Sequence, residues 1–165
     1  MSGTPRLALP FLSPGQAQKE LFHNEALQRL DAAVAAAVEE PPRTSPPPAP
    51  AAGACYLVGS GATGEWAGRD RSLASYSSGG WRYIEPVEGM SAYVRSSGTW
   101  AVYCSGGWEI GALRGSSVLI GGQQVVGSRF GPIAAPGGGT TVDTEARETI
   151  ALILAALRQH GLIQM

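Results

Sequence analysis

The residues in this sequence that are best suited to chemistry are aromatic. All four tryptophans and all five tyrosines lie between residues 56 and 108. A tryptophan ring offers a flat apolar face and one N–H donor, which complements a sugar ring with apolar C–H faces and hydroxyl groups at its edges. The aromatic residues therefore favour a surface that binds carbohydrate. The alternative is that they fill the core of a small β domain that is short of aliphatic side chains.

These aromatic residues belong to an internal repeat. The order Tyr, Gly-x-Trp-Ala, Tyr-x-Ser-Gly-Gly-Trp occurs at residues 56–81 and again, in a shorter copy, at residues 93–108. Each copy is typical of a β-hairpin or meander with a Gly-Gly turn. The repeat places Trp66 and Trp100 at one equivalent position, and Trp81 and Trp108 at another.

The two equivalent pairs of tryptophans are expected to differ in role. Trp81 and Trp108 follow Gly-Gly turns and precede apolar or aromatic residues, so we expect them in the core. Trp66 and Trp100 each follow a glycine and a polar residue, so we expect them at the surface. Trp66 is the best single candidate for a sugar platform. The predicted ligand-binding residues are Trp66, Trp100, Tyr76 and Tyr103.

The sequence lacks the familiar catalytic patterns. It contains no HExxH, GxSxG or phosphate-loop motif, and it has two histidines. We therefore expect no enzyme activity, no catalytic residue, no metal site and no cofactor. The alternative is an enzyme that cleaves polysaccharide, which would need two carboxyl groups held several ångströms apart. The acidic residues of the β region that could form such a pair are Glu65, Asp70, Glu85, Glu88 and Glu109.

The composition argues against several classes of partner. The net charge is −1 and charged residues make up 15% of the chain, so no basic surplus is available for nucleic acid or for an anionic membrane. Residues 1–12 lack the apolar core of a secretion signal, so we expect the chain to start in the cytoplasm. Two cysteines are too few for a disulfide scaffold or a zinc site, so we expect Cys55 and Cys104 to remain unpaired.

Two helices are predicted, one near each end of the sequence. The first begins at Ser13, with Pro14 at the first helical position and Gln16 completing a capping box, and runs to Glu40. The second begins after Asp143, which suits an N-cap. Each helix carries an apolar stripe; the stripe residues are Leu27, Leu30, Val34 and Val38 in the first and Ala146, Ile150, Ile153 and Leu157 in the second.

These elements predict an α+β fold in four parts. Residues 1–40 form an attachment or oligomerisation segment with a helix, and residues 41–54 form a stiff proline-rich spacer. Residues 55–142 form an antiparallel β domain, and residues 143–165 form the C-terminal helix. The apolar stripes pack either on the β domain or on copies of the chain. A small core with two exposed stripes favours a homo-oligomer, and we favour a trimer because that is the usual symmetry of fibres.

The chain also resembles a domain family of unknown function found in alphaproteobacterial prophages and gene transfer agents. The resemblance covers nearly the whole chain. The most specific block is Gln16-Ala17-Gln18-Lys19-Glu20, followed by His23-Asn24-Glu25-Ala26-Leu27. Further matching residues are Gly53, Tyr56, Val58-Gly59, Ala62-Thr63-Gly64, Trp66-Ala67-Gly68, Gly80-Trp81, Pro86 to Gly89, Asp143 to Arg147, Leu157-Arg158 and His160 to Leu162.

The resemblance implies a role in a virion. Members of that family look like fibre, spike or adhesin components, some of them associated with attachment to surface polysaccharide of the host. The chain is therefore expected to be a head spike or tail fibre component, assembled in the bacterial cytoplasm and located in the virion. Its expected partners are other virion proteins, copies of itself and host capsular polysaccharide. A structural connector without glycan binding is a further alternative.

Overall fold

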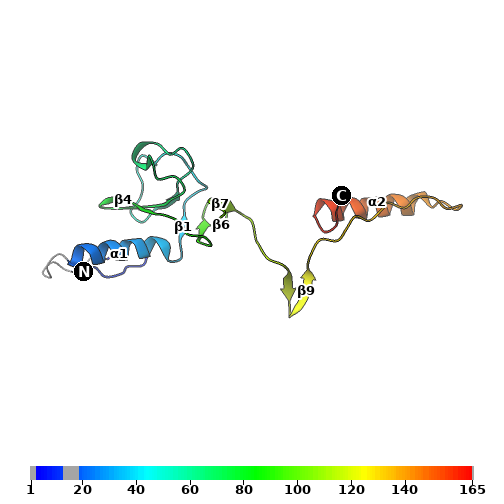
Figure 1. The fold of residues 1–165 in the computed structure, drawn as a ribbon, viewed down its shortest axis with the longest axis horizontal. Coiled ribbons are helices and arrows are strands. Elements are labelled where there is room, and N and C mark those ends of the chain that lie inside the picture. The colour runs from blue at the N-terminus through cyan, green and yellow to red at the C-terminus, as the bar shows by residue number, and fades with distance from the viewer. Residues whose placement is uncertain (1–2, 13–18, 165) are drawn as a thin grey trace. The chain divides into compact units, whose positions relative to one another are not determined.

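The computed structural model describes residues 3–12 and 19–164 of the 165-residue chain. It has an α+β fold with two helices and several antiparallel sheets (Figure 1). The chain divides into two units, residues 1–113 and residues 114–165. The predicted β domain at 55–142 therefore has the wrong boundary. The helix and proline-rich segment that precede it belong to the same unit as the strands, and the chain beyond residue 113 belongs to the second unit.

The first helix, α1 (Lys19–Ala33), ends earlier than the sequence predicted. Ala35 has a left-handed backbone (φ 49°), which a helix cannot continue through, and β1 (Ala37–Val38) follows. Val34 is half-exposed whereas Val38 is fully buried in β1, so the predicted stripe from Leu27 to Val38 is not one face of a helix. The predicted helix start at Ser13, with Pro14 and Gln16, lies outside the described residues.

A buried carboxylate fastens the N-terminal segment to the end of α1. Asp31 accepts hydrogen bonds from the Thr4 hydroxyl (2.6 Å) and from the backbone N–H groups of Arg6 and Leu7. The Arg6 side chain in turn donates to the carbonyl oxygens of Asp31 and Ala32 in the last turn of α1, and to that of Ala35 just beyond the helix. Residues 3–12 thus satisfy the C-terminal end of α1.

The proline-rich segment at 41–54 is not a spacer between separate parts. The N–H of Arg43 donates to the carbonyl of Leu57 (3.1 Å), and the carbonyl of Arg43 accepts from the N–H of Gly59 (2.7 Å). The N–H of Thr63 donates to the carbonyl of Thr44. Proline removes N–H groups but leaves the intervening residues free to pair, so this segment runs along the adjacent strand.

Two small sheets make up the first unit. One has the order β2-β3-β4 and is antiparallel throughout. The other has the order β1-β5-β6-β7, in which β1 pairs with β5 in parallel and the remaining pairs are antiparallel. The strand bounds are β2 Cys55–Leu57, β3 Leu73–Ser77, β4 Gly80–Ile84, β5 Ser91–Val94, β6 Thr99–Cys104 and β7 Gly107–Ile110, with a 3₁₀ turn, η1, at Gly64–Trp66.

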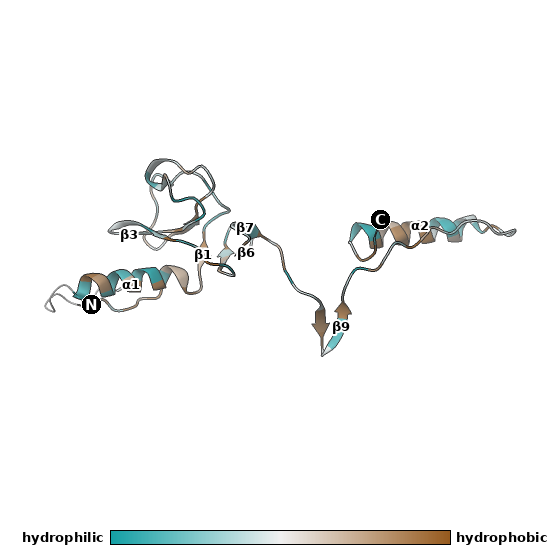
Figure 2. Ribbon diagram, in the orientation of Figure 1, coloured by the Kyte–Doolittle hydropathy of each residue, from teal (hydrophilic) through white to brown (hydrophobic). Residues whose placement is uncertain are grey.

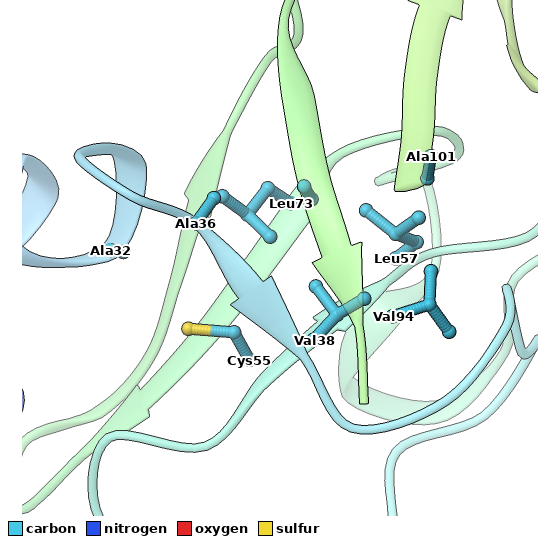
Figure 3. Packing of buried hydrophobic residues seen from close by; sticks show 9 residues of the cluster. Ala32, Ala36, Val38, Cys55, Leu57, Leu73, Val94 and Ala101 are labelled. Atoms are coloured by element: carbon cyan, nitrogen blue, oxygen red, sulfur yellow. The ribbon is translucent and has the colours of Figure 1, made fainter. Parts of the chain in front are cut away.

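The sheet β2-β3-β4 has a core on each of its faces. Its strand β2 is buried along its whole length. Alternate residues Cys55 and Leu57 belong to a cluster shared with β1, β5 and β6, in which Figure 3 shows Val38 and Val94 beside Leu57. The intervening residue Tyr56 belongs to a second cluster together with Trp66. The hydrophobic residues of the first unit thus form two layers around one sheet.

The second unit has little core. It contains the hairpin β8 (Val118–Ile120) and β9 (Gln123–Val126), whose apolar character is visible in Figure 2, and the helix α2 (Thr144–Gln159). The Asp143 carboxylate caps α2 by accepting from the N–H of Ala146 (2.9 Å). Leu154 and Ile163 are its buried hydrophobic residues. Among the described residues, neither helix has the length and apolarity needed to cross a bilayer.

The hydrogen bonds accepted by Asp31 yield a prediction for the stability of the first unit. Asp31→Ala leaves three donors without their acceptor, and hydrogen bonds to a charged group contribute about 1.5–3 kcal/mol each, so the first unit should lose roughly 3 kcal/mol or more. Thr4→Val removes the donor to Asp31 and the acceptor of the Leu9 N–H at nearly constant shape, and should cost about 1–2 kcal/mol. Urea unfolding followed by tryptophan fluorescence reports on residues 1–113 alone, because every tryptophan lies there. Equal midpoints for wild type and Asp31→Ala would contradict this account.

Candidate functional site

The pairs Tyr76–Trp81 and Tyr103–Trp108 occupy equivalent places in two meanders, β2-β3-β4 and β5-β6-β7, whereas Trp66 precedes β3 and Trp100 lies within β6. Tyr76 pairs with Trp81 across β3 and β4, and Tyr103 pairs with Trp108 across β6 and β7. The ring centroids of the two pairs are 5.0 and 5.4 Å apart, in edge-to-face geometry. Trp81 and Trp108 are partly buried and each packs against a core cluster. Aromatic pairs of this kind stabilise a sheet beyond the area that they bury.

Trp66 is not the surface platform that the sequence predicted. It is fully buried, with 0% of its surface exposed. Trp66 lies in η1, in the loop between β2 and β3, and contacts Tyr56 and Trp81 at centroid distances of 5.8 and 5.0 Å. It thereby belongs to the second hydrophobic cluster. The prediction for Trp66 is wrong because its burial depends on how this loop packs onto the sheet, which the flanking residues do not show.

Trp100, at the equivalent position of the second copy, lies at the surface with 50% of its area exposed. It stands opposite Tyr93 across β5 and β6, with ring centroids 5.6 Å apart. Ala92 and Ala101, the neighbours of these two residues, are fully buried, so strand alternation directs both aromatic rings outward. We call Tyr93 and Trp100 the aromatic surface.

Apolar and hydroxyl groups border the aromatic surface. A shallow groove of about 170 Å³ is lined by Thr99, Trp100, Gly111, Ala112 and Leu113. Thr99 also shares a hydrogen bond of 2.8 Å with the Ser97 hydroxyl. A ring face beside rotatable hydroxyl groups suits a sugar, whose apolar face can stack while its hydroxyls exchange hydrogen bonds.

The two predicted tyrosines lie elsewhere. Tyr76 is half-buried against Trp81, and its backbone pairs with Gly53 and Ala54. Tyr103 lines a separate recess of about 390 Å³ with Gly68, Asp70, Arg71, Glu85 and Pro86. The structure thus does not bring the four predicted residues into one site. Tyr93 was missed, although the register of a hairpin turning at residues 95–98 would have placed it opposite Trp100.

The recess beside Tyr103 contains two of the acidic residues that a cleaving enzyme would need, Asp70 and Glu85. The Asp70 carboxylate accepts from the backbone N–H groups of Gly61 and Ala62, at 2.9 and 3.0 Å. These two bonds lower the pKa of Asp70, because they favour the charged form. A general acid needs a raised pKa, so Asp70 is better suited to fastening the loop at 58–72.

The remaining candidates for chemistry are few in the described part of the chain. Residues 3–12 and 19–164 hold no group of three or more His, Cys, Asp or Glu placed to bind a metal ion. Burial raises the pKa of the Cys55 thiol, which makes this side chain less reactive. The aromatic surface is consequently the candidate binding site.

Comparison with protein-family models matches residues 23–109 to a family described as Protein of unknown function (DUF2793). The match spans more than half of the 165-residue chain, and it includes every aromatic residue discussed above. No curated protein matches the chain. The function must therefore be inferred from the geometry of the molecule itself.

The difference in burial between Trp66 and Trp100 can be tested by measuring stability. Trp66→Ala should destabilise the first unit by about 3–5 kcal/mol, because it empties a fully buried site. Trp100→Ala should cost less than about 1 kcal/mol, because half of that side chain already contacts water. Urea unfolding curves monitored by the three remaining tryptophans give both values. Similar losses in the two variants would refute this difference in burial.

Proposed function

The chain belongs to the DUF2793 family, and we propose that it is a structural component of a phage-like particle, a head spike or tail fibre that contacts polysaccharide on the host surface. In this proposal the chain is a homo-oligomer, with a trimer favoured. It is assembled in the bacterial cytoplasm and located in the virion, where it also contacts capsid or tail proteins. The observation that carries the proposal is the unpartnered apolar surface of the second unit.

The second unit leaves large aliphatic side chains in water. The hairpin exposes residues of both of its strands, and α2 exposes several positions of its predicted stripe. The exposed residues are Val118, Leu119, Ile120, Val125, Val126, Ile150, Leu152 and Ile153. An isolated two-stranded hairpin is at best marginally stable, and a 52-residue unit (residues 114–165) needs more core than Leu154 and Ile163 supply. Copies of the chain that cover one another's apolar faces would supply it.

Self-association would also make a weak sugar site useful. A shallow aromatic surface with one exposed tryptophan is expected to bind a single sugar weakly. Several copies on one particle bind a repeating polysaccharide together, and linked sites can exceed the affinity of one site by about 10²–10⁴. The partial exposure of Trp100 and Tyr93 supports this contact. Nucleic acid and membrane lipid are not proposed as partners, given a net charge of −1.

A structural connector without glycan binding is the second candidate function. The exposed aliphatic residues of the second unit favour it as much as they favour an adhesin, because both roles require assembly. The aromatic surface distinguishes a connector from an adhesin, because assembly alone does not require an exposed tryptophan beside hydroxyl groups. An enzyme that cleaves polysaccharide receives less support, because both carboxylate oxygens of Asp70 accept hydrogen bonds from the backbone of Gly61 and Ala62.

The self-association can be tested by placing charge on the apolar faces. In the intact chain, Leu119→Asp combined with Ile153→Asp should convert the oligomer into a monomer, because burying an unpaired carboxylate is costly. Light scattering after size-exclusion chromatography at micromolar concentration measures the mass. Val87→Asp is the matched control, because Val87 is also an exposed aliphatic residue, at 70% against 59% for Leu119 and 53% for Ile153, but lies in the first unit. A monomeric wild-type protein would contradict the proposal, as would an oligomer that survives the double substitution.

The sugar contact can be tested with the exposed tryptophan. Trp100→Ala should weaken attachment of the oligomer to host capsular polysaccharide by about tenfold or more. Removal of an aromatic side chain at a binding contact often costs about 2 kcal/mol or more of binding free energy. Sedimentation with purified capsule measures attachment, and light scattering checks that the oligomer is intact. Val87→Ala serves as the control. Unchanged attachment of a folded, oligomeric Trp100→Ala variant would leave the connector as the better assignment.

A further inference from the structure

Arg71 holds a backbone conformation that is unusual for its residue type. Its φ is +69°, in the left-handed region that favours glycine. Two hydrogen bonds fix it there, because the Arg71 N–H donates to the carbonyl of Val58 (2.9 Å) and the Trp108 indole N–H donates to the carbonyl of Arg71 (2.7 Å). Strained residues that their surroundings hold in place occur often at functional sites.

The Arg71 guanidinium makes no hydrogen bond and no ion pair with any residue of 3–12 or 19–164. Its chain neighbour Asp70 forms no ion pair with it within 4 Å, although the two charges attract each other at longer range; the carboxylate oxygens of Asp70 accept from the N–H groups of Gly61 and Ala62. The other arginines in the described part of the first unit each have a hydrogen bond, an ion pair or a ring contact; they are Arg6, Arg29, Arg43, Arg69, Arg82 and Arg95.

Arg71 borders a recess of about 260 Å³ that contains no acidic residue. The recess is lined by Pro42, Val58, Gly59, Ser60, Arg71, Gly106, Gly107 and Trp108. An Arg71 guanidinium nitrogen lies 3.8 Å from the position that a Cβ on Gly106 would occupy, so it stands beside the turn between β6 and β7. A Cβ on Gly107 would meet no atom within 4 Å, which marks open space there.

The acidic residues nearest to this recess lie outside it. Glu85 and Asp70 line the neighbouring recess on the Tyr103 side, which Arg71 also borders. Glu88 accepts from the N–H of Ser105 with both carboxylate oxygens, at 3.2 Å each. The recess itself therefore offers a cation, the Ser60 hydroxyl and an indole ring, and no carboxylate is among the residues that line it.

We infer that this recess binds a uronate, a sugar ring that carries a carboxylate, within an acidic polysaccharide. A planar guanidinium pairs with a carboxylate through two parallel N–H···O bonds, while the indole of Trp108 offers an apolar edge to the ring. The inference rests on the proposed function for the source of the ligand, and it adds the chemical class of the sugar. It concerns a site separate from the aromatic surface, on other strands and with other residues.

The test uses the intact chain and tetragalacturonate, titrated by isothermal calorimetry. The wild type should bind it, and binding should weaken with added salt because the pair is ionic. Arg71→Asn keeps a residue that tolerates the left-handed conformation and removes the charge, so it should lower the affinity about tenfold or more. Gly107→Val fills the open space on a β strand without touching the charge and should also lower the affinity. Arg69→Asn, an exposed neighbour over the Tyr83 ring, is the control and should bind as wild type does.

The outcomes separate this inference from the proposed function. Equal affinity of wild type and Arg71→Asn for tetragalacturonate overturns the uronate site, and so does equal binding of a neutral galactose tetrasaccharide by the wild type. Neither result depends on self-association or on Trp100, because the titration uses a short soluble sugar. A chain that binds tetragalacturonate through Arg71 but stays monomeric overturns the proposed fibre role while it supports the site.

Discussion

The burial of one short sheet on both faces is the constraint on which the rest of the first unit depends. In β2, Cys55 and Leu57 face one cluster while Tyr56 faces the other, so no side chain of this strand reaches water. A strand in that position needs cover on both sides. The sheet β1-β5-β6-β7 covers one side, and the loop that carries Trp66 covers the other. The first of these layers packs aliphatic side chains on the sheet, and the second packs aromatic ones.

The two meanders differ in burial because the first is covered on both faces and the second on one. The first meander uses Trp66, Tyr56 and Trp81 as a packed aromatic group, which also receives the ring of Tyr83. The second meander is covered on one face by the first, so its other face stays open and Trp100 remains accessible. A repeat of sequence thus yields one structural tryptophan and one exposed tryptophan. The difference arises because Trp66 lies in the loop before β3, whereas Trp100 lies within β6.

Sequence patterns predicted local features better than burial. The Asp143 cap of α2 follows from residue type and position alone, and the structure contains that hydrogen bond. The end of α1 could not be predicted, because it depends on Arg6, whose side chain reaches the carbonyl of Ala35 from 29 residues away in the chain. The proline-rich segment read as a spacer because composition describes stiffness, whereas its pairing with Leu57 and Gly59 is a tertiary contact. Trp66 was misplaced for the same reason.

The two units differ in how many of their hydrophobic residues they bury. The first unit buries its own apolar residues and can hold fixed recesses, such as the one beside Arg71, whose shape requires a rigid backbone. The second unit buries Leu154 and Ile163 and leaves apolar residues of its hairpin exposed, and the proposed self-association would supply the core that these two residues do not. In that proposal, folding of the second unit is coupled to assembly. The recesses of the first unit are formed within one copy, so assembly would change how many of them act together on one particle and not their shape.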